Sequence, residues 1–306
     1  PAGTTSYTYD NRNRCTSETR IIEGKSYTIG YTYDAASRLV SLAYPDQSTV
    51  VYEYDALNRL ISIPGYAEFT YNSGSLLEST TFGNGVVTDY QYSTCCNRLL
   101  TIHAHKNGTD LLLMNYQYDA AGNITQLSCN RRLLNQQWAQ STETFTYDWL
   151  DRLIEAQGDY GSLCYTYDPV GNRISLNGVT YAYDVMNELL SVSDGTTFTY
   201  DESGNTLTKV NNTDTWLYIY DKINQLTQVE KNQEIIAQYT YDGDGRRIQK
   251  TEWVESLQDY QTTVYGYSGL NAIYEKNVST NEEATYVYGP TGRIAKNVDG
   301  LRDYYH

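Results

Sequence analysis

Residues 52–60 read Tyr-Glu-Tyr-Asp-Ala-Leu-Asn-Arg-Leu, and similar stretches recur along the whole 306-residue chain. Each copy has an aromatic residue, then any residue, then a Tyr that is followed in most copies by Asp. The second Tyr of the fourteen copies is Tyr9, Tyr33, Tyr54, Tyr71, Tyr92, Tyr118, Tyr147, Tyr167, Tyr183, Tyr200, Tyr220, Tyr241, Tyr267 and Tyr288. Self-similarity at this spacing indicates a repeat architecture, in which each unit packs mainly on its neighbours.

The aromatic spacing predicts a β-strand in every copy. Residues two apart lie on the same face of a strand, and Tyr27, Ile29, Tyr31 and Tyr33 show this alternation over seven residues. Aromatic and β-branched side chains also suit a pleated, half-buried surface. We therefore expect a strand that leads into each second Tyr.

The residues after the second Tyr predict a tight turn. The next residue is an Asp in ten copies: Asp10, Asp34, Asp55, Asp119, Asp148, Asp168, Asp184, Asp201, Asp221 and Asp242. Among all fourteen copies, the position three residues further on is Gly in five (Gly122, Gly171, Gly204, Gly245, Gly292) and Asn in five more (Asn13, Asn58, Asn187, Asn224, Asn271). Gly and Asn tolerate positive φ. We expect a hairpin loop in which the Asp carboxylate accepts backbone N–H groups of its own loop.

The return strand has an unusual apolar spacing. It begins with Leu or Ile and often has a second apolar residue three positions later, as in Leu60 and Ile63. Either a β-bulge or two apolar residues on opposite faces would explain this spacing. The longest gap lies between Tyr118 and Tyr147, where Leu133, Leu134 and Trp138 are candidates for an extra strand or short helix.

Composition completes the prediction of the fold. The chain has 33 Tyr residues and a mean hydropathy of −0.58, so it suits a sheet with partly hydrated, Tyr-covered faces better than a dry aliphatic centre. We predict an all-β fold of hairpins stacked into a coiled, hollow β-spiral or shell. Residues 1–306 should form a single repeat array, which we expect to be a fragment of a longer chain.

Charge and motifs argue against most chemical functions. The net charge of −15 disfavours nucleic-acid binding and attraction to anionic lipid, and no transmembrane run occurs. His103-Ala-His105 is a candidate metal pair, but no third ligand is near in the sequence, so we expect no metal there. Five Cys residues (Cys15, Cys95, Cys96, Cys129 and Cys164) do not form a disulfide framework. Candidate glycosylation sites are Asn107, Asn123, Asn211 and Asn277.

The units at residues 31–39, 52–60 and 165–173 resemble the YD-repeat or Rhs-repeat family. This family includes Rhs polymorphic toxins, C components of Tc toxins, wall-associated proteins and animal teneurins. The resemblance implies a β-sheet that spirals into a large hollow shell, which in toxin members encloses a C-terminal toxic domain. Asp168-Pro-Val-Gly171 matches the family's Asp-Pro-x-Gly self-cleavage motif only as an ordinary repeat turn. The resemblance therefore transfers no catalytic residue.

We expect a non-enzymatic structural scaffold without a cofactor, secreted or at the cell surface, that encloses or displays a C-terminal toxin-type domain. The alternative is an extracellular structural or adhesive protein that assembles end to end into filaments or binds glycans. The expected partners are other segments of the parent chain or further copies of this chain, with an encapsulated toxin domain or surface glycans as further candidates. Neither nucleic acid nor membrane insertion is expected.

Overall fold

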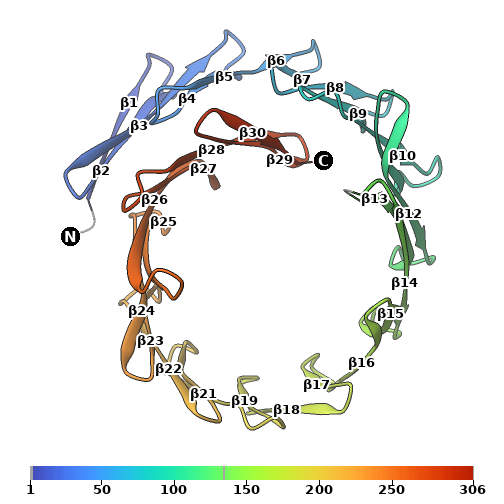
Figure 1. Cartoon of the computed structure of the whole chain (residues 1–306), viewed down its shortest axis with the longest axis vertical. Helices are drawn as coiled ribbons and strands as arrows, with labels where there is room; N and C mark the ends of the chain where they lie inside the picture. Colours follow the sequence, from blue (N-terminus) through green and yellow to red (C-terminus); the bar gives the residue numbers. More distant parts are fainter. Residues whose placement is uncertain (1–2, 134, 306) are drawn as a thin grey trace. The chain divides into compact units, whose positions relative to one another are not determined.

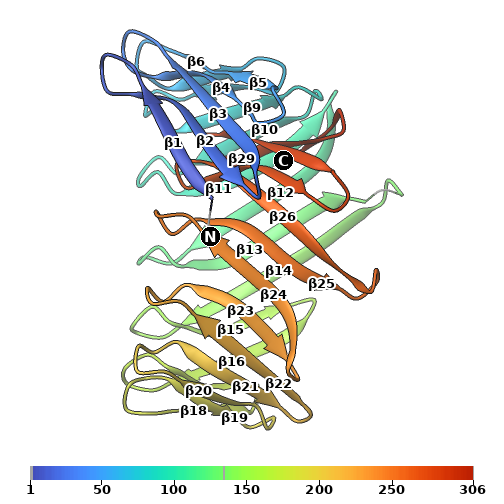
Figure 2. The same cartoon turned by 90° about the vertical axis from the view of Figure 1, so that its left-hand side faces the viewer.

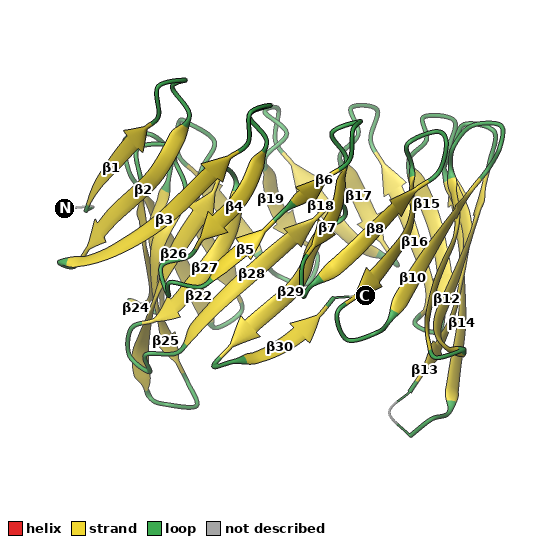
Figure 3. Cartoon of the chain, turned by 90° about the horizontal axis from the view of Figure 1, so that it is seen from above, coloured by secondary structure: helices red, strands yellow, loops and turns green. Residues whose placement is uncertain are grey.

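The computed structural model describes residues 3–133 and 135–305. Within these ranges every regular element is a β-strand and none is a helix (Figure 3). It follows that no helix in the described ranges has the length and apolar character to cross a membrane. The predicted all-β class is confirmed.

Contacts group the chain into two compact units. Unit 1 comprises the residues up to Glu68 together with Asp201–Thr208 and Thr213–Tyr305, and unit 2 comprises Phe69–Tyr200 with Lys209–Asn212. Unit 1 contains β1 (Thr4–Tyr9), β2 (Cys15–Ile22), β3 (Lys25–Tyr33), β4 (Leu39–Ala43), β5 (Thr49–Val51), β6 (Glu53–Tyr54), β7 (Leu60–Ile63), β22 (Asp214–Tyr220), β23 (Leu226–Lys231), β24 (Glu234–Tyr241), β25 (Arg247–Val254), β26 (Asp259–Ser268), β27 (Asn271–Asn277), β28 (Glu283–Gly289), β29 (Gly292–Val298) and β30 (Leu301–Tyr304). Unit 2 contains β9 (Leu77–Phe82), β10 (Val87–Tyr92), β11 (Leu99–Lys106), β12 (Thr109–Tyr118), β13 (Ile124–Arg132), β14 (Trp138–Tyr147), β15 (Leu153–Gly158), β16 (Gly161–Tyr167), β17 (Arg173–Leu176), β18 (Val179–Tyr183), β19 (Leu189–Val192) and β20 (Thr197–Tyr200), while β8 (Ala67–Tyr71) and β21 (Thr206–Asn211) have residues in both units.

Each repeat is an antiparallel hairpin, and successive strands pair with one another within each sheet, whereas β5 and β6 lie in different sheets. In the hairpin β16–β17, for example, Tyr167 ends β16 and lies opposite Arg173. The loop is closed by a bond from the Asp168 N–H to the Asn172 carbonyl at 2.9 Å. Gly171 has φ 102° there, in the left-handed region that the sequence predicted.

One predicted left-handed position is wrong. Asn271 is the first residue of β27 and is not among the residues with positive φ. Gly269 has φ 58° in its place. The turn after Tyr267 is one residue shorter than the turn after Tyr167, because Ser268 already pairs with Asn271. A glycine at the second turn position therefore takes the strained conformation.

The apolar spacing of the return strand reflects a β-bulge. Tyr54 lies opposite Leu60 and Glu53 lies opposite Ser62, so Ile61 is an extra residue in the return strand. The bulge places Leu60 and Ile63 on the same face despite their spacing of three. The same register shift precedes the second Tyr in hairpins of both units.

Among the described residues, the long gap before Tyr147 contains neither an extra strand nor a short helix. Instead β13 and β14 are lengthened to 9 and 10 residues, and their pairing extends to Arg132 opposite Trp138. The Leu133 N–H donates to the Gln137 carbonyl within the turn, and Leu134 lies outside the described residues. The expected extra strand or short helix is therefore wrong. The additional residues lengthen β13 and β14, which continue to pair with each other.

The densest core lies in unit 1, where N-terminal strands pack on C-terminal strands. Figures 1 and 2 both show β1 to β5 beside β26 to β29. The Tyr27 and Tyr274 rings are 6.1 Å apart, and the Tyr44 hydroxyl donates to the Tyr286 carbonyl at 3.0 Å. Val287 is fully buried. Segments far apart in the sequence thus share one core, which the local repeat pattern did not predict.

Candidate functional site

The residues that join one repeat to the next form the principal candidate site of a scaffold protein. Each turn is organised by its Asp. Asp55 Oδ1 accepts the backbone N–H of Leu57 at 2.8 Å and of Arg59 at 2.9 Å. Asp55 Oδ2 accepts the Arg59 Nε–H at 2.7 Å. One carboxylate thus satisfies two backbone donors and orients the side chain four positions later.

That fourth side chain reaches the next repeat. Arg38 Nη1 donates to the Asp55 carbonyl at 3.1 Å, and Arg152 Nη1 donates to the Asp168 carbonyl at 2.9 Å. Where the residue is Asn, its side-chain amide also donates to the next turn, as Asn172 Nδ2 does to Asn187 Oδ1 at 2.9 Å. We call this series of contacts between successive turns the turn ladder.

The second Tyr makes another contact between repeats. Its hydroxyl donates to a carbonyl at the start of the preceding return strand, as Tyr167 does to Leu153 at 2.7 Å. The same bond links Tyr54 to Leu39, Tyr118 to Leu99, Tyr147 to Ile124, Tyr183 to Arg173, Tyr200 to Leu189, Tyr241 to Leu226, Tyr267 to Arg247 and Tyr288 to Ala272. The Arg152 guanidinium also lies over the Tyr167 ring at 4.8 Å.

Sequence reasoning identified the Tyr and Asp of each repeat but missed the fourth residue after the Asp. That residue is polar in all ten copies: Arg14, Arg38, Arg59, Asn123, Arg152, Asn172, Glu188, Asn205, Gln225 and Arg246. This pattern was visible in the sequence. Its role was not, because the partner of each side chain lies in a different repeat.

Hydrogen bonding lowers the pKa of eight of the ten turn carboxylates. The side chain of Arg14 lowers the pKa of Asp10, and the side-chain amide of Asn123 lowers the pKa of Asp119. The pKa is also below its ordinary value for Asp34, Asp55, Asp148, Asp168, Asp201 and Asp242. These carboxylates therefore act as fixed hydrogen-bond acceptors at neutral pH, a structural role.

A cluster of buried charges connects β2 to the turn between β24 and β25 in unit 1. Arg20 is 2% exposed, and its Nη2 contacts Glu18 at 2.5 Å and Asp242 at 2.9 Å. Arg246 contacts the same Glu18 oxygen at 3.3 Å. We call Glu18, Arg20, Asp242 and Arg246 the charge clasp. Asp242 and Arg246 are the Asp and the fourth residue after it in one repeat. Through the charge clasp they also bind β2, which lies more than 200 residues earlier in the sequence.

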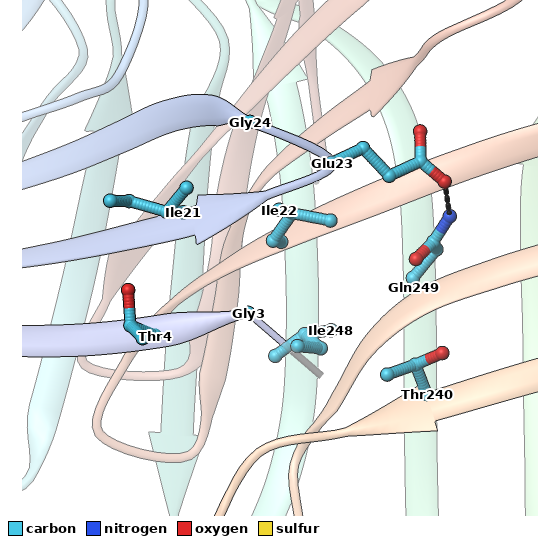
Figure 4. Close-up of a pocket in the computed structure, with 9 residues that line it drawn as sticks. All are labelled: Gly3, Thr4, Ile21, Ile22, Glu23, Gly24, Thr240, Ile248 and Gln249. Carbon is cyan, nitrogen blue, oxygen red and sulfur yellow. Dashed lines mark hydrogen bonds between the residues drawn. The ribbon is translucent and has the colours of Figure 1, made fainter. Parts of the chain in front are cut away.

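A cavity of about 700 Å³ lies next to the charge clasp, between the β2–β3 turn and the strands β24 and β25 (Figure 4). Ile22 and Ile248 contribute apolar surface, and Gln249 Nε2 donates to Glu23 Oε1 at 2.7 Å. Glu23 is the only ionisable residue among the nine that line the cavity. The lining therefore offers no acid–base pair for catalysis.

The described residues that could hold a metal ion include His103 and His105. The strand register adds a third residue to them, Asp89 of β10, which the sequence did not place nearby.

The five cysteines are free thiols, and the Cys95 and Cys96 sulfur atoms are hydrogen-bonded at 3.2 Å.

The four candidate glycosylation residues differ in how far their side chains are engaged. Asn107 is exposed in the turn between β11 and β12. Asn123 Nδ2 donates to both Asp119 and Asp151, and Asn277 Nδ2 donates to Gln261. Asn211 Oδ1 accepts the amide of Asn212. A glycan on Asn123 would replace one of the amide hydrogens that the turn ladder uses, so Asn107 offers the most accessible of the four sites.

Known proteins share this architecture. Residues 95–305 match the teneurin YD-shell family and residues 33–63 match the RHS repeat. The tRNA nuclease WapA of Bacillus subtilis is 30% identical over 252 residues, which are 78% of this chain and 10% of that protein. The double-stranded DNA deaminase toxin A of Burkholderia cenocepacia is 24% identical over 318 residues, covering 93% of this chain and 20% of that protein.

A solved structure agrees in fold. A chain of the Tc holotoxin pore of Photorhabdus luminescens superposes with a TM-score of 0.72 at 19% identity, covering 96% of this chain and 17% of that one. The chain thus spans between a tenth and a fifth of the length of these relatives. The family match covers well over half of the sequence, and the repeated hairpins, bulges and turns are those of stacked YD repeats. This chain belongs to the teneurin YD-shell family.

Proposed function

We propose that this chain is a section of a secreted or cell-surface shell that encloses or displays a toxin-type domain of the same parent protein. Its role as a structural repeat scaffold follows from the family and the fold. The enclosed domain is the additional inference, supported by relatives that are named as toxins. We also propose that residues 1–306 act as one array.

The observation that carries the proposal is the coupling between repeats. The turn ladder and the Tyr hydroxyls tie each hairpin to the next, and the charge clasp ties β2 to β24–β25. Side chains committed to such contacts form a wall rather than a catalytic centre. The activities in the names of WapA and the deaminase toxin belong to whole proteins, of which this chain matches a small part.

Limited proteolysis of the natural protein that contains this sequence tests the proposal. If the scaffold encloses a further domain, that domain should resist protease in the intact protein and become sensitive in an Arg20→Ala variant, where the charge clasp is broken. A cargo domain that is cleaved equally fast in both proteins would contradict enclosure. Nuclease and deaminase assays on residues 1–306 alone should show no activity above buffer.

An alternative function, assembly into extracellular filaments, is favoured by the edge strand β1. It is the terminal strand of the five-stranded sheet β1–β5, and all six of its residues are exposed. An exposed strand edge is a template for pairing with another chain. Light scattering at rising concentration distinguishes the two functions, because growth of long particles supports the filament and a constant particle mass supports the scaffold.

A further inference from the structure

Two of the three His residues of the chain lie in one small patch of unit 2. His103 and His105 are both on β11 and are separated by one residue, so their side chains leave the same face of the sheet. Their rings are 5.1 Å apart. This face is opposite to the one that carries the repeat tyrosines, because His103 pairs with Asp89 and Ile102 pairs with Tyr90. The two imidazoles are therefore not part of the turn ladder or the Tyr contacts.

The neighbouring strands place a carboxylate on each side of this pair. Asp89 of β10 lies opposite His103, and Asp110 of β12 lies opposite His105. The hydrogen bonds run diagonally. His105 Nε2 contacts Asp89 Oδ2 at 3.0 Å, and His103 Nε2 contacts Asp110 Oδ1 at 2.8 Å. The Nε2 atom of each His therefore already faces a carboxylate oxygen.

We propose that Asp89, His103 and His105 form a binding site for a divalent transition-metal ion of the Zn²⁺ type. Their donor atoms lie within 4.8 Å of one another. Around a tetrahedral Zn²⁺ with bonds of about 2.0–2.2 Å, two donor atoms are about 3.3–3.6 Å apart. Small side-chain rotations on a fixed backbone bring the three donors to that separation, since the strand register already places them side by side.

The donor set selects the class of ion. Imidazole nitrogen suits Zn²⁺, Cu²⁺ and Ni²⁺, whereas Ca²⁺ and Mg²⁺ prefer sites made of oxygen ligands. The side chains of His103 and His105 are 33% and 29% exposed, so an ion has access from solvent and water can complete its coordination. Asp110 is close enough to His103 to be the fourth ligand. A bound ion would join β10, β11 and β12 across two strand interfaces.

Zinc titration of the tag-free chain tests the site. The experiment uses a background in which Cys95 and Cys96 are replaced by Ser, because these exposed thiols in the β10–β11 loop also attract zinc. Calorimetry should show one Zn²⁺ per chain, and bound zinc should raise the thermal midpoint. Replacing His103→Gln, His105→Gln or Asp89→Asn should each weaken binding by at least about tenfold, the lower end of what loss of even an outer partner costs.

Two controls keep the result interpretable. Asp159→Asn changes an exposed carboxylate of unit 2 that has no His beside it, and it should leave zinc affinity unchanged. Circular dichroism establishes that each His variant retains its β-sheet. Imidazole NMR signals of His103 and His105 should shift on addition of zinc. Binding that survives in the His103→Gln, His105→Gln double variant, or no binding to the folded chain in which Cys95 and Cys96 are replaced by Ser, overturns the proposal.

Discussion

The strands β28 and β14 both carry the second Tyr of a repeat, Tyr288 and Tyr147, but are packed in different ways. In β14 exposed and half-buried residues alternate, so one face of the strand is open to solvent. In β28 the four consecutive residues Ala284 to Val287 are all buried. The difference lies in the residues between the motif positions. β14 has Gln, Ser and Thr there, whereas β28 has apolar residues on both faces, which is typical of a strand covered on both sides.

The turns show the same division. Arg152 in unit 2 and Arg246 in unit 1 occupy the same repeat position, and each pairs with the Asp four residues before it. Arg246 also contacts Glu18 of the distant strand β2. The repeat motif therefore specifies a hairpin and its link to the next hairpin. Contacts over long sequence separations are added by residues outside the motif.

The largest effect is expected from Arg20→Ala in the charge clasp. Removal of Arg20 leaves Arg246 as the remaining counter-charge of the buried Glu18 and Asp242, and breaking a buried ion pair costs about 3–5 kcal/mol. The free energy of unfolding from chemical denaturation measures this loss. Arg152→Ala, in the partly exposed pair of unit 2, should cost about 1 kcal/mol or less. Equal losses for both variants would mean that the clasp adds nothing to an ordinary repeat turn.

Two isoleucines compare the packing of the two units directly. Ile294 of β29 is 1% exposed and Ile174 of β17 is 38% exposed, and each is the extra residue of its own bulge. Ile294→Ala should lower the free energy of unfolding by about 2–5 kcal/mol, because it removes buried volume from a close-packed core. Ile174→Ala should change it by about 1 kcal/mol or less. A larger loss at Ile174 would show that bulge residues carry more of the packing than their exposure indicates.

Asn58 tests the backbone of the turn. Its φ of 64° lies in the left-handed region, where a residue with a Cβ costs about 1–2 kcal/mol and a β-branched one more. Both Asn58→Val and Asn58→Gly remove the oxygen that accepts Arg38 Nη1 at 3.1 Å, but only Val is strained at this φ, so Asn58→Val should lower the thermal midpoint more than Asn58→Gly. In the same loop, Asp55→Ala should lower the midpoint more than Asp55→Asn, which retains an oxygen acceptor for the Leu57 and Arg59 N–H groups. No shift in Asn58→Val and Asp55→Ala would contradict the role assigned to this turn.

How far the fold could be predicted depends on the range of each interaction. The strand before Tyr54, the turn after Asp55 and the positive φ of Asn58 follow from residues within nine positions, so the sequence predicted them. The contact of Arg20 with Asp242 joins residues that share no repeat position, and no local pattern predicts it. For the same reason the sequence did not predict that Asp89 lies beside His103 and His105. The register of β10 and β11, rather than spacing along the chain, brings these residues together.

Removing a tyrosine hydroxyl should lower the free energy of unfolding by a smaller amount, and this amount should again differ between the two units. Tyr167→Phe removes a bond to the Leu153 carbonyl in a half-buried setting, with an expected cost of about 1 kcal/mol. Tyr44→Phe leaves the Tyr286 carbonyl without this donor in the buried core of unit 1, and should cost about 1–3 kcal/mol. Paired denaturation curves give both values. A greater loss at Tyr167 would reverse the comparison and make the contact between repeats the stronger of the two.

The smallest change in stability should come from protonation of a single turn carboxylate as the pH is lowered. The pKa of Asp119 is lowered by the side chain of Asn123, so the unfolded chain binds more protons than the folded chain as the pH falls. The stabilisation from this carboxylate is present above the ordinary Asp pKa of about 3.9 and is lost as the pH falls from about 5 through the lowered value.

For Asp242 burial opposes ionisation, but hydrogen bonds from Arg246 and the charge of Arg20 outweigh it and lower the pKa. Carboxyl NMR titration should therefore place both groups below the ordinary value, and protonation of Asp242 should also weaken the charge clasp. Asp119→Asn should flatten the acid decline slightly, whereas Asp242→Asn should leave Arg20 underpaired and lower stability even at neutral pH. If the two variants behave alike, then Asp242 acts only as a repeat residue and the clasp depends on Glu18.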